Sequence, residues 1–161
     1  MNRKVLRALP IISGTGNASS IYDLVENFEY VLLQDTSDWN PAPKLMIDVA
    51  GGTTPDLVLR STTSGENRIY IEVKLTAEIS REAPFSQVVR HFLHLLAISR
   101  HTPVMGIKDM RRAVLLAAPS AWFERKVNMI KWQYFLDKYT DLATLPEVDI
   151  TLGELRLDSF Q

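Results

Sequence analysis

Three residues have side chains and a spacing that could support chemistry on a phosphate ester: Asp56, Glu72 and Lys74. Asp56 follows Pro55 at the start of one apolar segment, and fifteen residues separate it from the triplet Glu72-Val73-Lys74. Because side chains alternate along a strand, Glu72 and Lys74 share one face while Val73 turns into the core. Two carboxylates and an ammonium group on one face could bind a hard divalent cation and orient an attacking water.

The same residues also have a simpler interpretation. A Glu-x-Lys triplet in an amphipathic strand commonly forms a solvated charge pair with no catalytic role. A Pro-Asp dipeptide often only begins a turn. The combination of spacing, strand placement and order of the surrounding elements is what favours a site.

The elements that must position these residues can be predicted from the hydrophobic periodicity. Residues 14–20 are expected to form a loop, and Ser20 is expected to cap a helix whose apolar stripe covers 21–34. The further predicted elements are strands at 44–50, 55–60, 68–76 and 112–118, helices at 84–100 and 120–139, and a strand or hairpin around Gly153. The order predicts an α/β protein in which 112–118 joins the same sheet as 44–76.

The composition limits the class of protein. The chain has 161 residues, of which 46% are hydrophobic, enough for one domain with a sizeable core. The net charge is -1, so nucleic-acid binding would need a local basic patch or a metal ion. The absence of cysteine excludes disulfides and thiolate metal sites. No signal peptide or membrane-spanning run is recognisable, and we expect a soluble cytoplasmic protein.

The segments Pro55-Asp56 and Glu72-Val73-Lys74, in this order of elements, resemble the PD-(D/E)xK nuclease superfamily. The resemblance covers about residues 18–118. It implies a single nuclease domain with a restriction endonuclease-like α-β-β-β-α-β core, a mixed central sheet flanked by helices. Residues 119–161 would form a C-terminal extension with a helix and a strand or hairpin.

The resemblance also implies roles for individual residues. Asp56 and Glu72 would bind Mg²⁺, for which Mn²⁺ could substitute, with the Val73 carbonyl as a third ligand, and Lys74 would be the catalytic lysine. The implied activity is hydrolysis of DNA phosphodiester bonds, with RNA left open as a substrate. A homodimer or a partner protein is also open, and an inert nuclease-like binding protein is the alternative.

Each of the two predicted helices that flank the motif carries further candidate residues. Many members carry a glutamate on the first helix that faces the metal, and Glu29 is the candidate here, with an ordinary surface glutamate as the alternative. RecB-like members have a glutamine followed four residues later by a tyrosine. This chain has Gln87 followed by His91, which departs from that pattern but leaves both residues as candidate substrate contacts.

Two basic segments are further candidates for substrate binding. Arg111 and Arg112 could clamp a phosphate or could simply face solvent. The segment 120–139 combines aromatic residues with lysines, which suits base stacking and phosphate contact. An amphipathic helix that covers the sheet, or pairs with a dimer partner, is the alternative interpretation of 120–139.

Overall fold

The computed structural model describes residues 12–15, 30–33, 55–61, 68–76, 86–101 and 112–158. These residues form β1 (Ile12–Thr15), β2 (Tyr30–Leu33), β3 (Leu57–Ser61), β4 (Arg68–Val73), α4 (Gln87–His101), β5 (Arg112–Ala118), α5 (Ser120–Glu124), α6 (Lys126–Ala143) and β6 (Ile150–Arg156). None of the helices in these ranges is long and apolar enough to cross a membrane.

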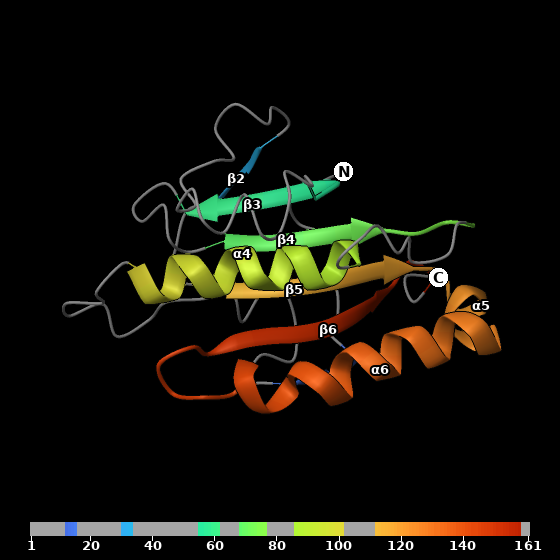
Figure 1. Cartoon of the computed structure of the whole chain (residues 1–161). Coiled ribbons are helices and arrows are strands. Elements are labelled where there is room, and N and C mark those ends of the chain that lie inside the picture. The colour runs from blue at the N-terminus through green and yellow to red at the C-terminus, as the bar shows by residue number, and fades with distance from the viewer. Residues whose placement is uncertain are drawn as a thin grey trace.

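The strands form one six-stranded mixed sheet with the order β1-β6-β5-β4-β3-β2 (Figure 1). β4, β5 and β6 run parallel at the centre, while β3 and β2 on one side and β1 on the other are antiparallel to their neighbours. All seven residues of β5 are buried, as expected for a central parallel strand. The predicted α/β class is confirmed, as is the expectation that 112–118 joins the sheet beside 68–76.

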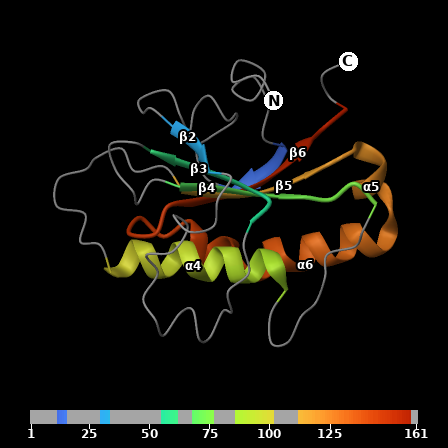
Figure 2. The ribbon, with the colours of Figure 1, turned by 90° about the horizontal axis from the view of Figure 1, so that it is seen from above.

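Helices α4 and α6 lie on the same face of the sheet (Figure 2). Between them and the strands is the larger core cluster, in which Phe92 of α4 and Phe135 of α6 meet edge to face. The opposite face of the sheet carries a second, smaller buried cluster that includes Ile69, Ile71 and Leu115. Side chains alternate between the two faces along β4, and residues on both faces are buried. Neither face of β4 is a solvent-exposed one.

The N-terminal end of α4 is fixed by Ser86. Its side-chain oxygen lies 3.4 Å from the backbone nitrogen of Val89, and its carbonyl accepts a hydrogen bond from Arg90 N–H at 3.0 Å. A serine in this position satisfies one of the amide groups that a helix start leaves without an intrahelical partner. α4 therefore begins directly after Ser86, at Gln87.

The aromatic segment forms two helices instead of the single predicted one. Arg125 has extended backbone angles, φ -68° and ψ 124°, and separates α5 from α6. The buried Asn128 side chain donates a hydrogen bond to the Trp122 carbonyl at 2.9 Å and so joins the two helices across the break. α6 also continues to Ala143, beyond the predicted end at 139.

Two other predictions need correction. Residues 30–33 were expected to be helical but form β2, which pairs antiparallel with β3, since a run of apolar residues suits either element and the edge of β3 supplies backbone partners. Residues 12–15 form β1, although a loop was expected from residue 14 onward, and β1 gains its partner from β6. Of the strand or hairpin expected around Gly153, the described residues form the strand, β6, which continues through Gly153 and pairs parallel with β5. The predicted strand 44–50 lies outside the described residues.

Candidate functional site

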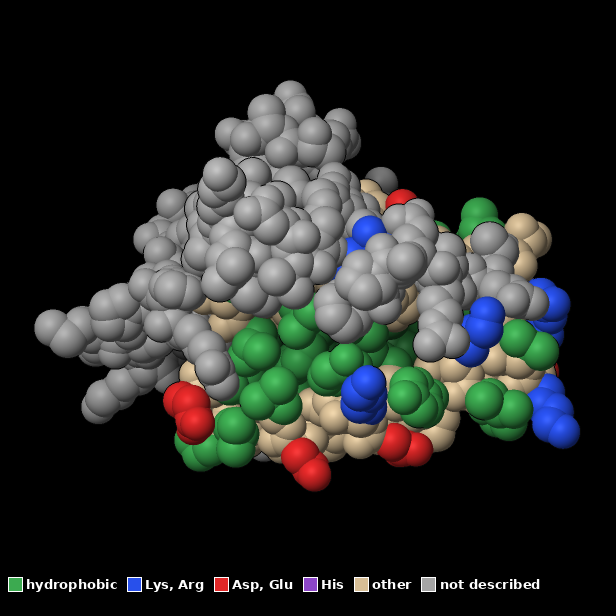
Figure 3. Space-filling model, in the orientation of Figure 1, with side chains coloured by type: hydrophobic (Ala, Val, Ile, Leu, Met, Phe, Trp, Pro, Cys, Tyr) green, Lys and Arg blue, Asp and Glu red, His purple; other side chains and the backbone are tan. Residues whose placement is uncertain are grey.

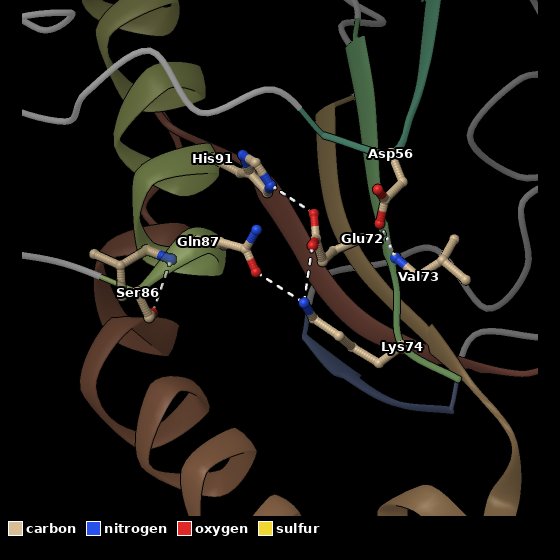
Figure 4. Close-up of polar contacts among 8 residues, drawn as sticks. Asp56, Glu72, Val73, Lys74, Ser86, Gln87 and His91 are labelled. Carbon is tan, nitrogen blue, oxygen red and sulfur yellow. Dashed lines mark hydrogen bonds and ion pairs between the residues drawn. The ribbon is translucent and has the colours of Figure 1, made fainter. Parts of the chain in front are cut away.

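The predicted motif lies where β3 and β4 meet at one end of the sheet. The pairing of Leu57 with Ile71 places Asp56, just before β3, beside the last residues of β4. The backbone N–H of Lys74 donates to the Ala117 carbonyl at 2.9 Å, which continues the alignment with β5 beyond the end of β4. The sheet thus brings the three predicted residues to one place from two strands (Figure 4).

Glu72 and Lys74 form a buried ion pair, with 3.2 Å between Lys74 Nζ and Glu72 Oε1. Their relative exposures are only 2% and 8%. The alternation of β4 predicted correctly that they share a face, but that face is covered by α4 and is not open to solvent. The interpretation of the triplet as a solvated surface pair is therefore wrong for this structure.

Two residues of the first turns of α4 complete the cluster. The Gln87 side-chain oxygen accepts a hydrogen bond from Lys74 Nζ at 2.8 Å. The Nε2 atom of His91 lies 3.0 Å from Glu72 Oε2, and His91 is fully buried. Gln87 and His91, the candidate substrate contacts on this helix, lie together in the structure, each in contact with a charged residue of the pair. The polar set Glu72, Lys74, Gln87 and His91 is referred to below as the β4–α4 cluster.

The direction of the hydrogen bond between His91 and Glu72 follows from the carboxylate. An ionised carboxylate can only accept hydrogen bonds, so Nε2 carries a hydrogen and donates it to Glu72. The other ring nitrogen, Nδ1, is buried and has no hydrogen-bond partner among the residues that the structure describes. Such a group is uncommon in a protein interior.

The ionisation of Glu72 depends on these contacts. Burial raises the pKa of the carboxyl group, but the hydrogen bond with His91, the charge of His91 and the charge and hydrogen bond of Lys74 together outweigh it. The pKa of Glu72 is consequently below its ordinary value. Glu72 therefore remains an anion at neutral pH although almost no solvent reaches it.

Asp56 differs from Glu72 in both exposure and orientation. It is exposed, and its Oδ2 accepts a hydrogen bond from the Val73 backbone N–H at 2.8 Å. Figure 4 shows the Glu72 carboxylate turned toward α4 and the Asp56 carboxylate turned toward the Val73 backbone. The hydrogen bond holds Asp56 beside the end of β4.

Asp56 and Glu72 are the side chains of the site that could bind a metal ion. In the described residues, no group of three or more histidine, aspartate or glutamate side chains is arranged to hold one. Mg²⁺ is usually held by one or two carboxylates and keeps several waters, so Asp56 and Glu72 have the right chemistry for it. The two buried histidines of α4 have different partners, since His91 contacts Glu72 and His94 Nδ1 lies 3.0 Å from the Tyr70 hydroxyl.

The other predicted site residues have different outcomes. Arg112 is buried at the first position of β5, whereas the Glu72 end of β4 pairs with Leu116, so Arg112 lies about 13 Å farther along the strand. It is therefore at the opposite end of the sheet from Glu72 and Lys74, and its burial contradicts the alternative that it simply faces solvent. Arg111 and Glu29 lie outside the described residues.

The aromatic segment covers the sheet. Its buried aromatic residues, Trp122, Phe123, Trp132 and Phe135, belong to the larger core cluster and are not open to bases. Trp132 Nε1–H also donates to Glu154 Oε2 at 3.2 Å, while Arg156 binds Glu154 Oε1. This buried polar group was missed in the sequence, although a glutamate two positions after Leu152 on the inner face of a strand could have indicated it.

The chain was compared with protein-family models, with curated proteins and with solved structures, and none of the three comparisons found a match.

Proposed function

We propose that this chain is a Mg²⁺-dependent nuclease of the PD-(D/E)xK type, with a restriction endonuclease-like core, that hydrolyses phosphodiester bonds of DNA. One observation carries the proposal: the buried ion pair of Glu72 and Lys74 at the end of β4, with the exposed Asp56 carboxylate beside it on the neighbouring strand.

The pair is difficult to explain as a device for stability. Removing two charges from water costs several kcal/mol for each ion, and apolar residues of similar volume often stabilise such a position equally well. Ionisable groups whose pKa is shifted by burial and by specific charged partners are concentrated at functional sites. The lowered pKa of Glu72 and its charged partner Lys74 fit that pattern.

The chemistry would divide among the residues as follows. Asp56 and Glu72 would hold the ion, which offsets negative charge on the scissile phosphate. Lys74 would orient the attacking water, whose oxygen forms a bond to phosphorus while the ester P–O bond breaks and the leaving oxygen takes up a proton. Gln87, through its 2.8 Å hydrogen bond, would fix the position of the Lys74 ammonium group.

The test is cleavage by purified protein. Supercoiled, linear, single-stranded and branched DNA, together with an RNA, would be incubated with Mg²⁺ or Mn²⁺ and with chelator. Wild-type protein should cleave at least one DNA only with metal, and Asp56→Asn, Glu72→Gln and Lys74→Met should each lose on the order of 10²-fold or more in rate. The matched control is Glu147→Gln, which neutralises an exposed carboxylate beyond α6. Undiminished cleavage by the three site variants would contradict the assignment.

Binding without cleavage is the second candidate, and a specific observation favours it. Glu72 and Lys74 are nearly inaccessible, and His91 occupies one oxygen of Glu72. A nuclease-like scaffold that binds nucleic acid or a protein partner could keep this cluster as a buried polar network. Metal-independent DNA binding by wild-type protein, with no cleavage of any substrate, would select this function.

A further inference from the structure

The outer side of α6 exposes several large apolar side chains to solvent. The helix packs on the sheet through Trp132, Phe135 and Leu136, which are buried. On the other side, Ile130 is 55% exposed and Tyr134 is 64% exposed, with Val127 beside them at 48%. Large apolar side chains exposed together on one helix commonly mark a surface that another molecule covers.

The charges of this side are separated along the helix. Lys126, Ile130, Tyr134, Asp137 and Asp141 follow one another at spacings of four, four, three and four residues, so they form one stripe, referred to here as the outer α6 stripe. Its first residue is basic, its middle residues are apolar and its last two residues are acidic. Beside the stripe, Lys138 places its Nζ 5.7 Å from the centre of the Tyr134 ring, and Asp137 accepts a hydrogen bond from Gln133 at 2.7 Å. Figure 3 shows hydrophobic side chains over α6, with most blue ones at the right-hand end, one blue one among the hydrophobic ones in the middle, and red ones along the lower edge.

This order of charges opposes the helix dipole. The first turn of α6 contains no acidic residue and its last turn contains no basic residue. The start of the helix carries partial positive charge and its end partial negative charge, so Lys126 and Asp141 each lie at the less favourable end. A neighbour that brings negative charge to the start and positive charge to the end would relieve both.

A second copy of α6 in antiparallel orientation has these properties. A twofold axis through the middle of the stripe sets Lys126 of one protomer opposite Asp137 of the other, and the same contact occurs twice. The two residues are eleven positions apart, about 16 Å along the helix, with Ile130 and Tyr134 between them. The apolar middles of the two stripes then cover each other, and the two helix dipoles run in opposite directions.

DNA suits the stripe less well than a second copy. Its phosphates would be attracted by Lys126 but repelled by Asp137 and Asp141 on the same stripe, whereas a self-complementary surface satisfies both signs of charge. We propose that the outer α6 stripe is a homodimer interface in which two copies of α6 pack antiparallel. This inference does not depend on the proposed nuclease function.

The test is a set of charge reversals followed by sedimentation equilibrium of the full chain at low salt. Because a contact made mainly by one helix pair is small, the concentration series should extend to on the order of 10⁻⁴ M. Wild-type protein should dimerise. Lys126→Glu and Asp137→Lys should each weaken dimerisation by about 10-fold or more, since each sets like charges opposite one another twice.

Two further samples test the pairing itself. The double variant Lys126→Glu/Asp137→Lys restores both contacts and should dimerise nearly as well as wild type. An equimolar mixture of the two single variants should form heterodimers, because one chain then presents two acidic residues and the other two basic ones. Ile130→Ser should also weaken association, by removing apolar contact from the centre.

A charge reversal outside the outer α6 stripe serves as the control. Glu147→Lys makes the same charge change as Asp137→Lys at an exposed position beyond α6 and should leave dimerisation unchanged. Lys126→Glu places a negative charge where the helix dipole favours it, so weaker association cannot be attributed to melting of α6. A wild-type monomer throughout the series would overturn the proposal, as would a dimer that none of the reversals affects or a double variant no better than the single ones.

Discussion

The Nε2 atom of His91 lies 3.0 Å from Oε2 of Glu72, and both side chains are buried where α4 crosses the end of β4. Four residues earlier on the helix, Gln87 contacts Lys74, the other member of the ion pair. One face of α4 therefore contacts both charges of β4, and the orientation of the helix and the geometry of the β4–α4 cluster depend on each other.

The first prediction concerns the free energy of the pair. Lys74→Met should destabilise the protein by roughly 3 kcal/mol, because it leaves the Glu72 charge buried with only His91 as a partner. The double variant Glu72→Gln/Lys74→Met removes both charges and should recover part of that loss. Urea unfolding of wild type, both single variants and the double variant gives the coupling energy. Single-variant effects that simply add in the double variant would show that the two side chains do not interact energetically.

The second prediction concerns pH. Since the folded-state pKa of Glu72 is below its ordinary value of 4.5, ionised Glu72 stabilises the folded state above that pH, and the contribution is lost as the pH falls through the lowered pKa. The stability difference between wild type and Glu72→Gln should therefore be constant near neutral pH and shrink in acid. Urea unfolding at several pH values from about 3 to 7 measures it.

The comparison with Glu72→Gln is essential, because a second carboxylate, Asp158, also makes the folded state less stable as the pH falls. The pKa of Asp158 is also lowered, by hydrogen bonds from the Ser120 hydroxyl and backbone. Wild type and Glu72→Gln share this contribution, and it cancels in their difference. A difference that stays unchanged down to the most acidic pH would contradict the role assigned to Glu72.

The third prediction separates the site from the helix that supports it. Gln87→Ala removes the acceptor for Lys74 and should lower the cleavage rate about 10-fold or more, with a modest loss of stability. Ser86→Ala, one residue earlier, removes the helix cap and should cost about 1 kcal/mol of stability while cleavage per folded molecule stays unchanged. Melting temperature and cleavage rate would be measured for both. Equal effects of the two variants on cleavage would argue against a positioning role for Gln87.

The fourth prediction concerns the polar contact behind the site. Tyr70→Phe removes the hydroxyl that meets His94 Nδ1 at 3.0 Å and leaves a buried ring nitrogen with one partner fewer. The expected cost is about 1–2 kcal/mol of stability with little change in cleavage, since the contact lies in the interior. Thermal melting and the plasmid assay would check it. A large loss of activity in a stable Tyr70→Phe protein would show that the site extends to His94.

Much of the central sheet could be predicted because its patterns are local. The alternation in 68–76 and the apolar run 112–118 indicated β4 and β5, and the 84–100 stripe indicated α4. Residues 30–33 could not be assigned in this way, since Val31 and Leu32 fit the helical spacing of the preceding residues. Their strand conformation depends on pairing with β3, which periodicity within a segment does not report.

The residues of the candidate site were predicted from the sequence, but their burial was not. The spacing of Glu72 and Lys74 predicted a shared face, and the family pattern made Gln87 and His91 candidate substrate contacts. Charged residues on an alternating strand nevertheless suggest exposure, and burial of the pair results from the position of α4 over β4. The polar contacts of Asp56 with the Val73 backbone and of Tyr70 with His94 require the three-dimensional arrangement and have no counterpart in residue spacing.

The place of β6 between β5 and β1 has a consequence for how the chain is synthesised. Ile12 of β1 pairs with Glu154 of β6, so β1 is synthesised long before the strand with which it pairs. While the ribosome is still adding residues, β1 has no edge to join and β5 lacks one of its two neighbours. Closing contacts between such distant segments is slow, and unpaired strand edges invite association with other chains in the interval. The nascent protein is therefore most exposed to aggregation until residues 150–156 have left the exit tunnel.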